Sequence, residues 1–193
     1  EGVEFHGDIN LLKAGLVYSD AITTVSPTYA KEVRSSKEFG YGLEGVFKKR
    51  ARKTYGILNG MDVTVWNPEV DKQIPKNYSA ETLGDKQENK KALCDHFKLP
   101  YDPKVPVIGI VSRLADQKGF DLIQESLEDL MGMDLQLVVL GSGEKKYEDL
   151  FTKAAKKYKK KVGAFIGFDE DLAHLIEAGA DMFLMPSKYE PCG

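Results

Sequence analysis

The segment at residues 112–119, Ser-Arg-Leu-Ala-Asp-Gln-Lys-Gly, places Arg113 and Lys118 ahead of Gly119, and is called the anion loop below. An apolar run precedes it and an amphipathic run follows, which predicts a turn from a strand into a helix. A helix N-terminus offers free N–H groups and partial positive charge, and Arg and Lys add charge-assisted hydrogen bonds to phosphate. The loop therefore predicts a diphosphate site. A solvated loop with incidental charges is the alternative.

A second polar segment, residues 186–193, reads Pro-Ser-Lys-Tyr-Glu-Pro-Cys-Gly and also follows an apolar run. Beside Pro and Gly, the carboxylate of Glu190 can point into a crevice and accept hydrogen bonds from sugar hydroxyls. Taken alone, such a glutamate is more often a surface carboxylate. Together with Arg113 and Lys118 it favours a site for a sugar joined to a phosphate.

The elements that must position these segments alternate regularly in the second half of the chain. Strands are expected at 105–111, 135–140, 162–166 and 182–185, and helices at 85–97, 119–130, 144–158 and 169–178. Apolar strands alternating with amphipathic helices are typical of a parallel sheet covered on both faces, so an α/β, doubly wound, Rossmann-like domain is expected. Ligands of such sheets bind beyond the carboxyl ends of the strands, where both polar segments fall.

Two other predicted strand ends carry weaker signals. Gly141-Ser142-Gly143 lacks the third glycine of a dinucleotide fingerprint, although it can line a nucleotide cleft. Gly167 and Phe168 follow the next strand, and the Phe168 ring can flank an adenine or simply pack.

The first 60 residues predict the end of another α/β domain. Asp8 is the expected N-cap of a helix through Leu12 and Leu16, and Ser26-Pro27 starts the next helix. The further expectations are a strand at 21–25, a flexible loop around Gly40, Gly42 and Gly45, a basic helix at 46–52 and a strand at 55–58 ending at Asn59-Gly60. We predict domains at 1–60 and 85–193, joined by a linker at 61–84 that lacks periodicity.

Composition excludes several classes of function. The chain of 193 residues has 27 Lys and Arg against 30 Asp and Glu, which offers no positive field for nucleic acid or an anionic membrane. Its basic runs at 48–53 and 156–161 are expected to be solvated helix faces, and no apolar run approaches the roughly 20 residues of a membrane span. The 2 cysteines and 3 histidines show no ligand spacing, so neither metal nor cofactor is expected.

Motifs along nearly the whole chain resemble the glycogen and starch synthases, members of the two-Rossmann-domain (GT-B) glycosyltransferases. The resemblance is carried by Ser-Arg-Leu-x-x-Gln-Lys-Gly in the anion loop and by Pro-Ser-x-x-Glu-Pro-Cys-Gly at 186–193. Further matching segments lie, in the same order as in the family, at 10–15, 23–30, 56–62 and 66–68.

The resemblance implies a retaining transfer of glucose from ADP-glucose or UDP-glucose to the non-reducing end of an α-1,4-glucan. It also implies that Arg113 and Lys118 bind the diphosphate and stabilise the departing nucleotide without a metal. Glu190 would orient the donor glucose. Cys192 and Gly193 would line its pocket through their backbone, and Asn59 would reach in from the first domain.

The chain departs from the family pattern at both ends, and an internal fragment is therefore expected. The family's Lys-x-Gly-Gly-Leu loop, its first-domain histidine and the second glutamate of its Glu-seven residues-Glu pattern have no counterpart in this sequence. We expect the fragment to turn over slowly or not at all. Bacterial cytoplasm, or plastid stroma in a plant or alga, is the expected compartment.

Other functions remain open at this stage. The chain could be a nucleotide-sugar-binding module without turnover or a non-catalytic scaffold. Another GT-B enzyme, such as a sucrose or trehalose-phosphate synthase, is a third alternative, although the Glu-Pro-Cys-Gly ending fits it less well.

Overall fold

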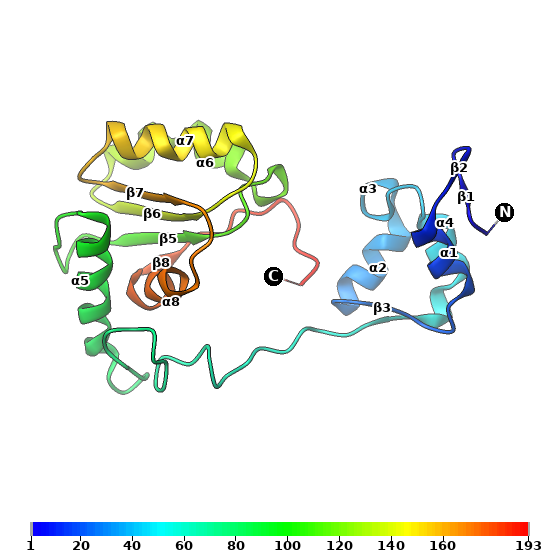
Figure 1. Cartoon of the computed structure of the whole chain (residues 1–193), viewed down its shortest axis with the longest axis horizontal. Helices are drawn as coiled ribbons and strands as arrows, with labels where there is room; N and C mark the ends of the chain where they lie inside the picture. The colour runs from blue at the N-terminus through cyan, green and yellow to red at the C-terminus, as the bar shows by residue number, and fades with distance from the viewer. Residues whose placement is uncertain (1, 193) are drawn as a thin grey trace. The chain divides into compact units, whose positions relative to one another are not determined.

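The structure is a computed structural model and describes residues 2–192. The chain divides into two compact units (Figure 1). The first comprises residues 2–61 together with 190–192, and the second comprises residues 62–189. Residues 62–84, expected to be a linker, thus group with the second unit.

The first unit is built from short elements. They are β1 (Glu4–Phe5), β2 (Asp8–Ile9), α1 (Leu11–Tyr18), β3 (Ile22–Thr24), α2 (Pro27–Ser35), α3 (Lys37–Gly40), α4 (Glu44–Lys49), the 3₁₀ turn η1 (Ala51–Lys53) and β4 (Thr54–Gly56). β1 pairs with β2 in antiparallel fashion, and β3 pairs with β4 in parallel. A small core of Leu16, Ile22 and Leu43 lies beneath them.

The helix starts in this unit follow from capping side chains. The Ser26 side chain accepts a hydrogen bond from the Tyr29 N–H, and Pro27 opens α2 as expected. The cap of α1 is Asn10, whose side chain accepts from the Lys13 N–H. The expectation of Asp8 as this cap is wrong, because Asp8 is used in β2.

The glycine-rich stretch of the first unit is more ordered than expected. Gly40 ends the short helix α3, and Gly45 lies inside α4, so the expectation of a flexible loop spanning all three glycines is wrong. Among the three glycines Gly42 has a left-handed backbone, with φ of 85°, and it follows Tyr41, which has φ of 50°.

The second unit contains the regular α/β pattern. Its elements are η2 (Leu83–Asp85), α5 (Lys86–Phe97), β5 (Val107–Val111), η3 (Asp116–Lys118), α6 (Phe120–Gly132), β6 (Gln136–Gly141), α7 (Lys145–Lys157), β7 (Val162–Ile166), α8 (Glu170–Gly179) and β8 (Met182–Phe183). The strands form one parallel sheet in the order β7-β6-β5-β8. The predicted parallel α/β architecture is confirmed, with element ends shifted by one to two residues and a shorter last strand.

Helices cover both faces of this sheet, as Figure 1 shows: α6 and α7 lie on one face, and α5 and α8 on the other. Each face has its own core. One contains Phe120, Leu137 and Phe151, and the other contains Leu93, Val138 and Ile176. Strands buried on both sides explain the continuous apolar runs of the sequence.

Residues 62–82 contain neither α-helix nor β-strand, yet they are anchored to the rest of the second unit. Asp71 is buried and its Oδ2 lies 2.6 Å from Nδ1 of His174 in α8. The Trp66 ring stacks on the His174 ring at a centroid distance of 3.7 Å. The segment is therefore a strap along α8, anchored by the side chains of Trp66 and Asp71.

Candidate functional site

The anion loop begins by extending the pairing between β5 and β6 beyond the strands. The Ser112 N–H donates to the Leu140 carbonyl at 3.1 Å, and the Leu114 N–H donates to the Ser142 carbonyl at 2.9 Å. The Leu114 carbonyl in turn accepts from the Glu144 N–H at 2.7 Å. The loops that follow β5 and β6 are thus bound to each other, with Leu114 fully buried between them.

The end of the anion loop requires glycine. After the 3₁₀ turn η3, Gly119 adopts φ 72° and ψ 25°, which lets the chain enter α6. A Cβ atom at this position would lie 2.0 Å from the Pro186 carbonyl oxygen. The close approach brings the chain after β8 directly against the loop.

A cleft of about 220 Å³ lies at the carboxyl ends of β5, β6 and β7, where the sequence predicted a ligand site. Its lining residues are Val111, Ser112, Arg113, Leu140, Gly141, Ser142, Gly167, Phe168, Asp169 and Ala173. Arg113, Gly167 and Phe168, predicted from separate segments, are thereby brought together. Phe168 is 89% exposed, so its ring is available to a ligand rather than packed in the core.

Gly141 and Ser142, whose segment the sequence allowed to line a nucleotide cleft, are part of this lining, whereas sequence reasoning gave Ser112 and Asp169 no site role. The Asp169 side chain accepts a hydrogen bond from the Leu172 N–H and caps α8, so the start of that helix borders the cleft. A helix-capping signal at a strand end is the pattern that could have identified Asp169.

The remaining predicted residues lie outside this cleft. Lys118 is half-buried in η3. Asn59 is exposed after β4 and belongs to the first unit, with which the half-buried Glu190 and Cys192 also group. Gly193 lies outside the described residues.

Charged groups hold the anion loop on its outer side. Asp116 Oδ1 lies 2.5 Å from Lys146 Nζ and accepts a hydrogen bond from the Tyr147 hydroxyl at 2.6 Å. The hydrogen bond from Lys146 and then that from Tyr147 lower the pKa of Asp116 below its ordinary value, and the hydrogen bond to Asp116 raises the pKa of Lys146. Burial and the same carboxylate raise the pKa of Tyr147. All three groups therefore keep their usual protonation states near neutral pH.

The segment after β8 holds the other side of the loop. The Lys188 N–H donates to the Gln117 carbonyl at 2.9 Å, and Gln117 Nε2 donates to the Tyr189 carbonyl at 3.1 Å. Lys188 Nζ pairs with Asp121 at 3.0 Å and lowers the pKa of that carboxyl. Arg113, in contrast, is exposed, and its guanidinium has no hydrogen bond or ion pair within residues 2–192.

Among the described residues, no three His, Cys, Asp or Glu side chains gather closely enough to hold a metal ion. No helix between residues 2 and 192 is long and apolar enough to cross a membrane.

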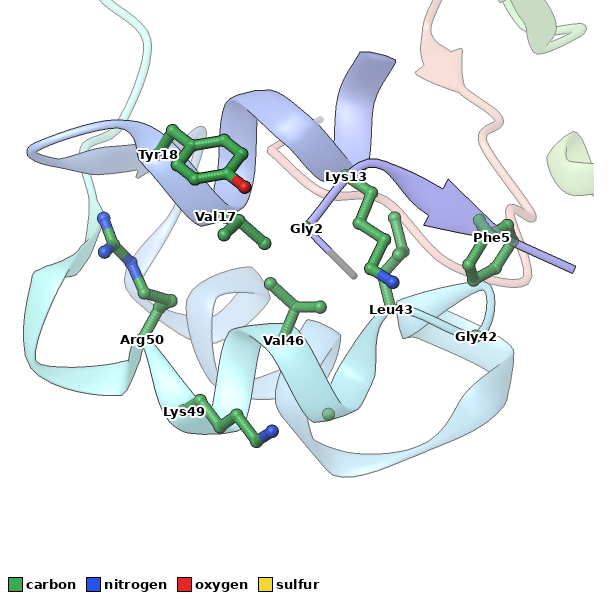
Figure 2. A pocket seen from close by; sticks show the side chains of 11 residues that line it. Gly2, Phe5, Lys13, Val17, Tyr18, Gly42, Leu43, Val46, Lys49 and Arg50 are labelled. Carbon is green, nitrogen blue, oxygen red and sulfur yellow. The ribbon is translucent and has the colours of Figure 1, made fainter. Parts of the chain in front are cut away.

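The first unit has a cavity of its own, of about 820 Å³, between β1, α1 and α4 (Figure 2). Val17, Leu43 and Val46 form its apolar part, and Lys13 and Lys49 lie at its edge. None of the predicted site residues lines it.

Comparison with known proteins places the chain in a family. Residues 94–193 match the family described as glycosyl transferases group 1. The chain belongs to this family. Residues 1–49 match the starch synthase catalytic domain, so the two matches flank the boundary between the two compact units.

Glycogen synthases are similar to the chain along its whole length. Those of Thermosipho africanus and Myxococcus xanthus are each 51% identical over all 193 residues, which confirms the resemblance drawn from the motifs. The chain spans about two-fifths of the length of these relatives, 40% of each.

A solved structure supports the same relationship. The catalytic domain of starch synthase IV from Arabidopsis thaliana, bound to ADP and acarbose, superposes with a TM-score of 0.89 at 36% identity. The match covers 96% of this chain and 38% of that one. A glycosyltransferase from Rickettsia africae at 19% identity and a TM-score of 0.52 shares the fold alone. The GT-B fold class predicted from the motifs is thus confirmed.

Proposed function

We propose that the protein containing this chain is a retaining glucosyltransferase that moves glucose from ADP-glucose to the non-reducing end of an α-1,4-glucan. UDP-glucose is the alternative donor. The observation that carries the proposal is the cleft at the ends of β5, β6 and β7, where Arg113 lines a ligand-sized space together with Gly167. Identity of 51% to glycogen synthases over the whole chain supports the choice of reaction.

The proposed donor site uses the second unit. Arg113 and Lys118 bind the diphosphate, and the partial positive charge at the start of α6 favours the same anion. Phe168 and Gly167 border the nucleotide. The starch synthase IV structure, bound to ADP and acarbose, supports a nucleotide and a saccharide as the ligand classes.

The proposed glucose site uses the residues that the resemblance to the glycogen and starch synthases implies. Glu190 orients the glucose, Cys192 and Gly193 contact it through their backbone, and Asn59 contributes from the first domain, which we place at residues 1–60. Residues 85–193 would be the nucleotide-sugar domain and 61–84 the connection. Since the glycogen synthase relatives are bacterial, we place the protein in a bacterial cytoplasm, with the plastid stroma as the alternative for a plant.

The test is transfer of labelled glucose to glycogen by the full-length protein that contains this chain, with ADP-glucose and UDP-glucose as parallel donors and label counted in the precipitated polymer. Arg113→Ala removes the positive charge that stabilises the leaving nucleotide. The rate should fall about a hundredfold to a thousandfold, as for other donors of this type.

The matched control is Lys153→Ala, which removes an exposed cation from α7 in the same unit and should leave transfer unchanged. Lys118→Met should lower the rate of transfer, as Arg113→Ala does. Glu190→Gln should also lower the rate, but without weakening ADP binding. Equal transfer by Arg113→Ala and Lys153→Ala would exclude the proposed diphosphate site.

A further inference from the structure

We propose that Asp116, Lys146 and Tyr147 are positioning residues that hold the anion loop in the shape that binds a nucleoside diphosphate. The inference rests on the proposed function, because it concerns how the Arg113 and Lys118 loop is kept ready for its ligand. None of the three side chains lines the cleft, so they act through the loop rather than on the ligand.

The first support is the set of independent bonds that meet at Asp116. Its side chain accepts from the Tyr147 hydroxyl and from Lys146, while its backbone N–H donates to Glu144 Oε1 at 2.8 Å. All of these partners lie on α7 or at its start. One residue in the middle of the loop is therefore fastened to a neighbouring helix by both its side chain and its backbone.

The second support is the rigidity of the partner. Tyr147 is 2% exposed, and its ring contacts Phe120, the first residue of α6, at a centroid distance of 5.4 Å. Its hydroxyl thus projects from a packed core onto the loop. A donor fixed by packing restrains its acceptor more than a surface side chain does, because it loses little freedom on bonding.

The third support is electrostatic. Asp116 puts a carboxylate into a loop expected to attract a diphosphate, and an uncompensated negative charge there would repel the ligand. Lys146 Nζ, at 2.5 Å, offsets that charge, and Glu144 Oε2 lies 3.3 Å from the same ammonium. Lys146 therefore has two roles: it restrains the loop, and it offsets part of the negative charge that Asp116 and Glu144 bring to it.

The test measures ADP affinity of the full chain by titration calorimetry in variants that leave the cleft residues intact. Tyr147→Phe deletes only the hydroxyl, and Lys146→Met deletes the charge. Each should weaken ADP binding about twofold to tenfold, the value of one net hydrogen bond. The double variant Asp116→Asn with Lys146→Met should bind better than Lys146→Met alone, and the loss in Lys146→Met should shrink at high salt.

The chain offers matched controls at the other end of α7. The Tyr158 hydroxyl and Lys157 both contact Glu128 of α6, and neither residue lines the cleft. Tyr158→Phe and Lys157→Met delete the same chemical groups and should leave ADP affinity unchanged. The inference would be overturned if Tyr147→Phe and Lys146→Met bound ADP as tightly as these controls. It would also be overturned if the double variant bound ADP no better than Lys146→Met.

Hydrogen exchange separates this result from failure of the proposed function. If the loop is held as described, Tyr147→Phe accelerates exchange of the Asp116 and Leu114 amides without ligand, and Tyr158→Phe does not. Absence of ADP binding, or binding unaffected by Arg113→Ala, would refute the proposed nucleotide site. Unchanged exchange at Asp116 would refute the positioning role whatever the ligand.

Discussion

At the scale of single residues, backbone conformation decides whether the anion loop can close. Gly119 has a left-handed φ of 72°, and a Cβ atom added there would lie 2.0 Å from the Pro186 carbonyl oxygen. Either feature alone opposes a side chain. Gly132, at the other end of α6, has open space around its Cβ position and thus provides a comparison within the same helix.

We therefore predict that Gly119→Ala destabilises the second unit by about 1–3 kcal/mol or more, since this range is the usual cost of a strained non-glycine backbone. Gly132→Ala should be neutral or stabilising by up to about 1 kcal/mol, because alanine is the better helix former. Urea unfolding followed by fluorescence of the single tryptophan, Trp66, measures both. Equal midpoints for the two variants would contradict the assignment of strain to Gly119.

At the scale of elements, the strap at residues 62–82 holds α8, whose start borders the cleft. Asp71 and His174 meet inside the fold, and their side chains are 8% and 1% exposed. Gln73 Nε2 adds a hydrogen bond of 3.0 Å to Asp171. Lys86 Nζ donates to the Glu177 and Ala178 carbonyls at the end of α8. The helix is thus restrained along its length.

Asp71→Ala should cost about 1–3 kcal/mol of stability, because the buried ring nitrogen of His174 loses its partner. It should also accelerate hydrogen exchange in α8. Glu69→Ala removes an exposed carboxylate from the same strap and should change stability by no more than about 0.5 kcal/mol. A strap that merely tethers would respond equally to both substitutions.

At the scale of the whole molecule, the two units bury very different cores. The second has an extensive core on each face of its sheet, whereas the buried cluster of the first consists of Leu16, Ile22 and Leu43 among the described residues. Stability grows with buried apolar surface, so local opening should require less free energy in the first unit than in the second.

We predict that amides of α1 and β3 exchange through openings of lower free energy than those of β5 and β6. Leu137→Ala should lower the unfolding free energy reported by Trp66 by about 2–5 kcal/mol, as expected for a buried leucine. Leu16→Ala should lower the protection of first-unit amides against hydrogen exchange. The unfolding transition reported by Trp66 should stay unchanged. Coincident shifts of both probes in both variants would show a single cooperative unit instead.

The sequence by itself determined the features that depend on local patterns. Apolar runs and helix periodicity located the elements of the parallel sheet, and Ser26 with Pro27 located the start of α2. The same alternation placed Arg113, Gly167 and Phe168 at strand ends, and the structure brings them to one cleft. Strand and helix signals arise within a few residues of each other, which is why they are readable from the chain alone.

Only the tertiary structure decided which distant residues meet. Asp116 and Tyr147 are 31 positions apart, and Asp71 and His174 are 103 apart. Nothing in their local sequence indicates a partner, because the contact exists only after the helices have packed on the sheet. The same holds for Gly119, whose need for glycine comes from the Pro186 carbonyl beside it as well as from its own turn.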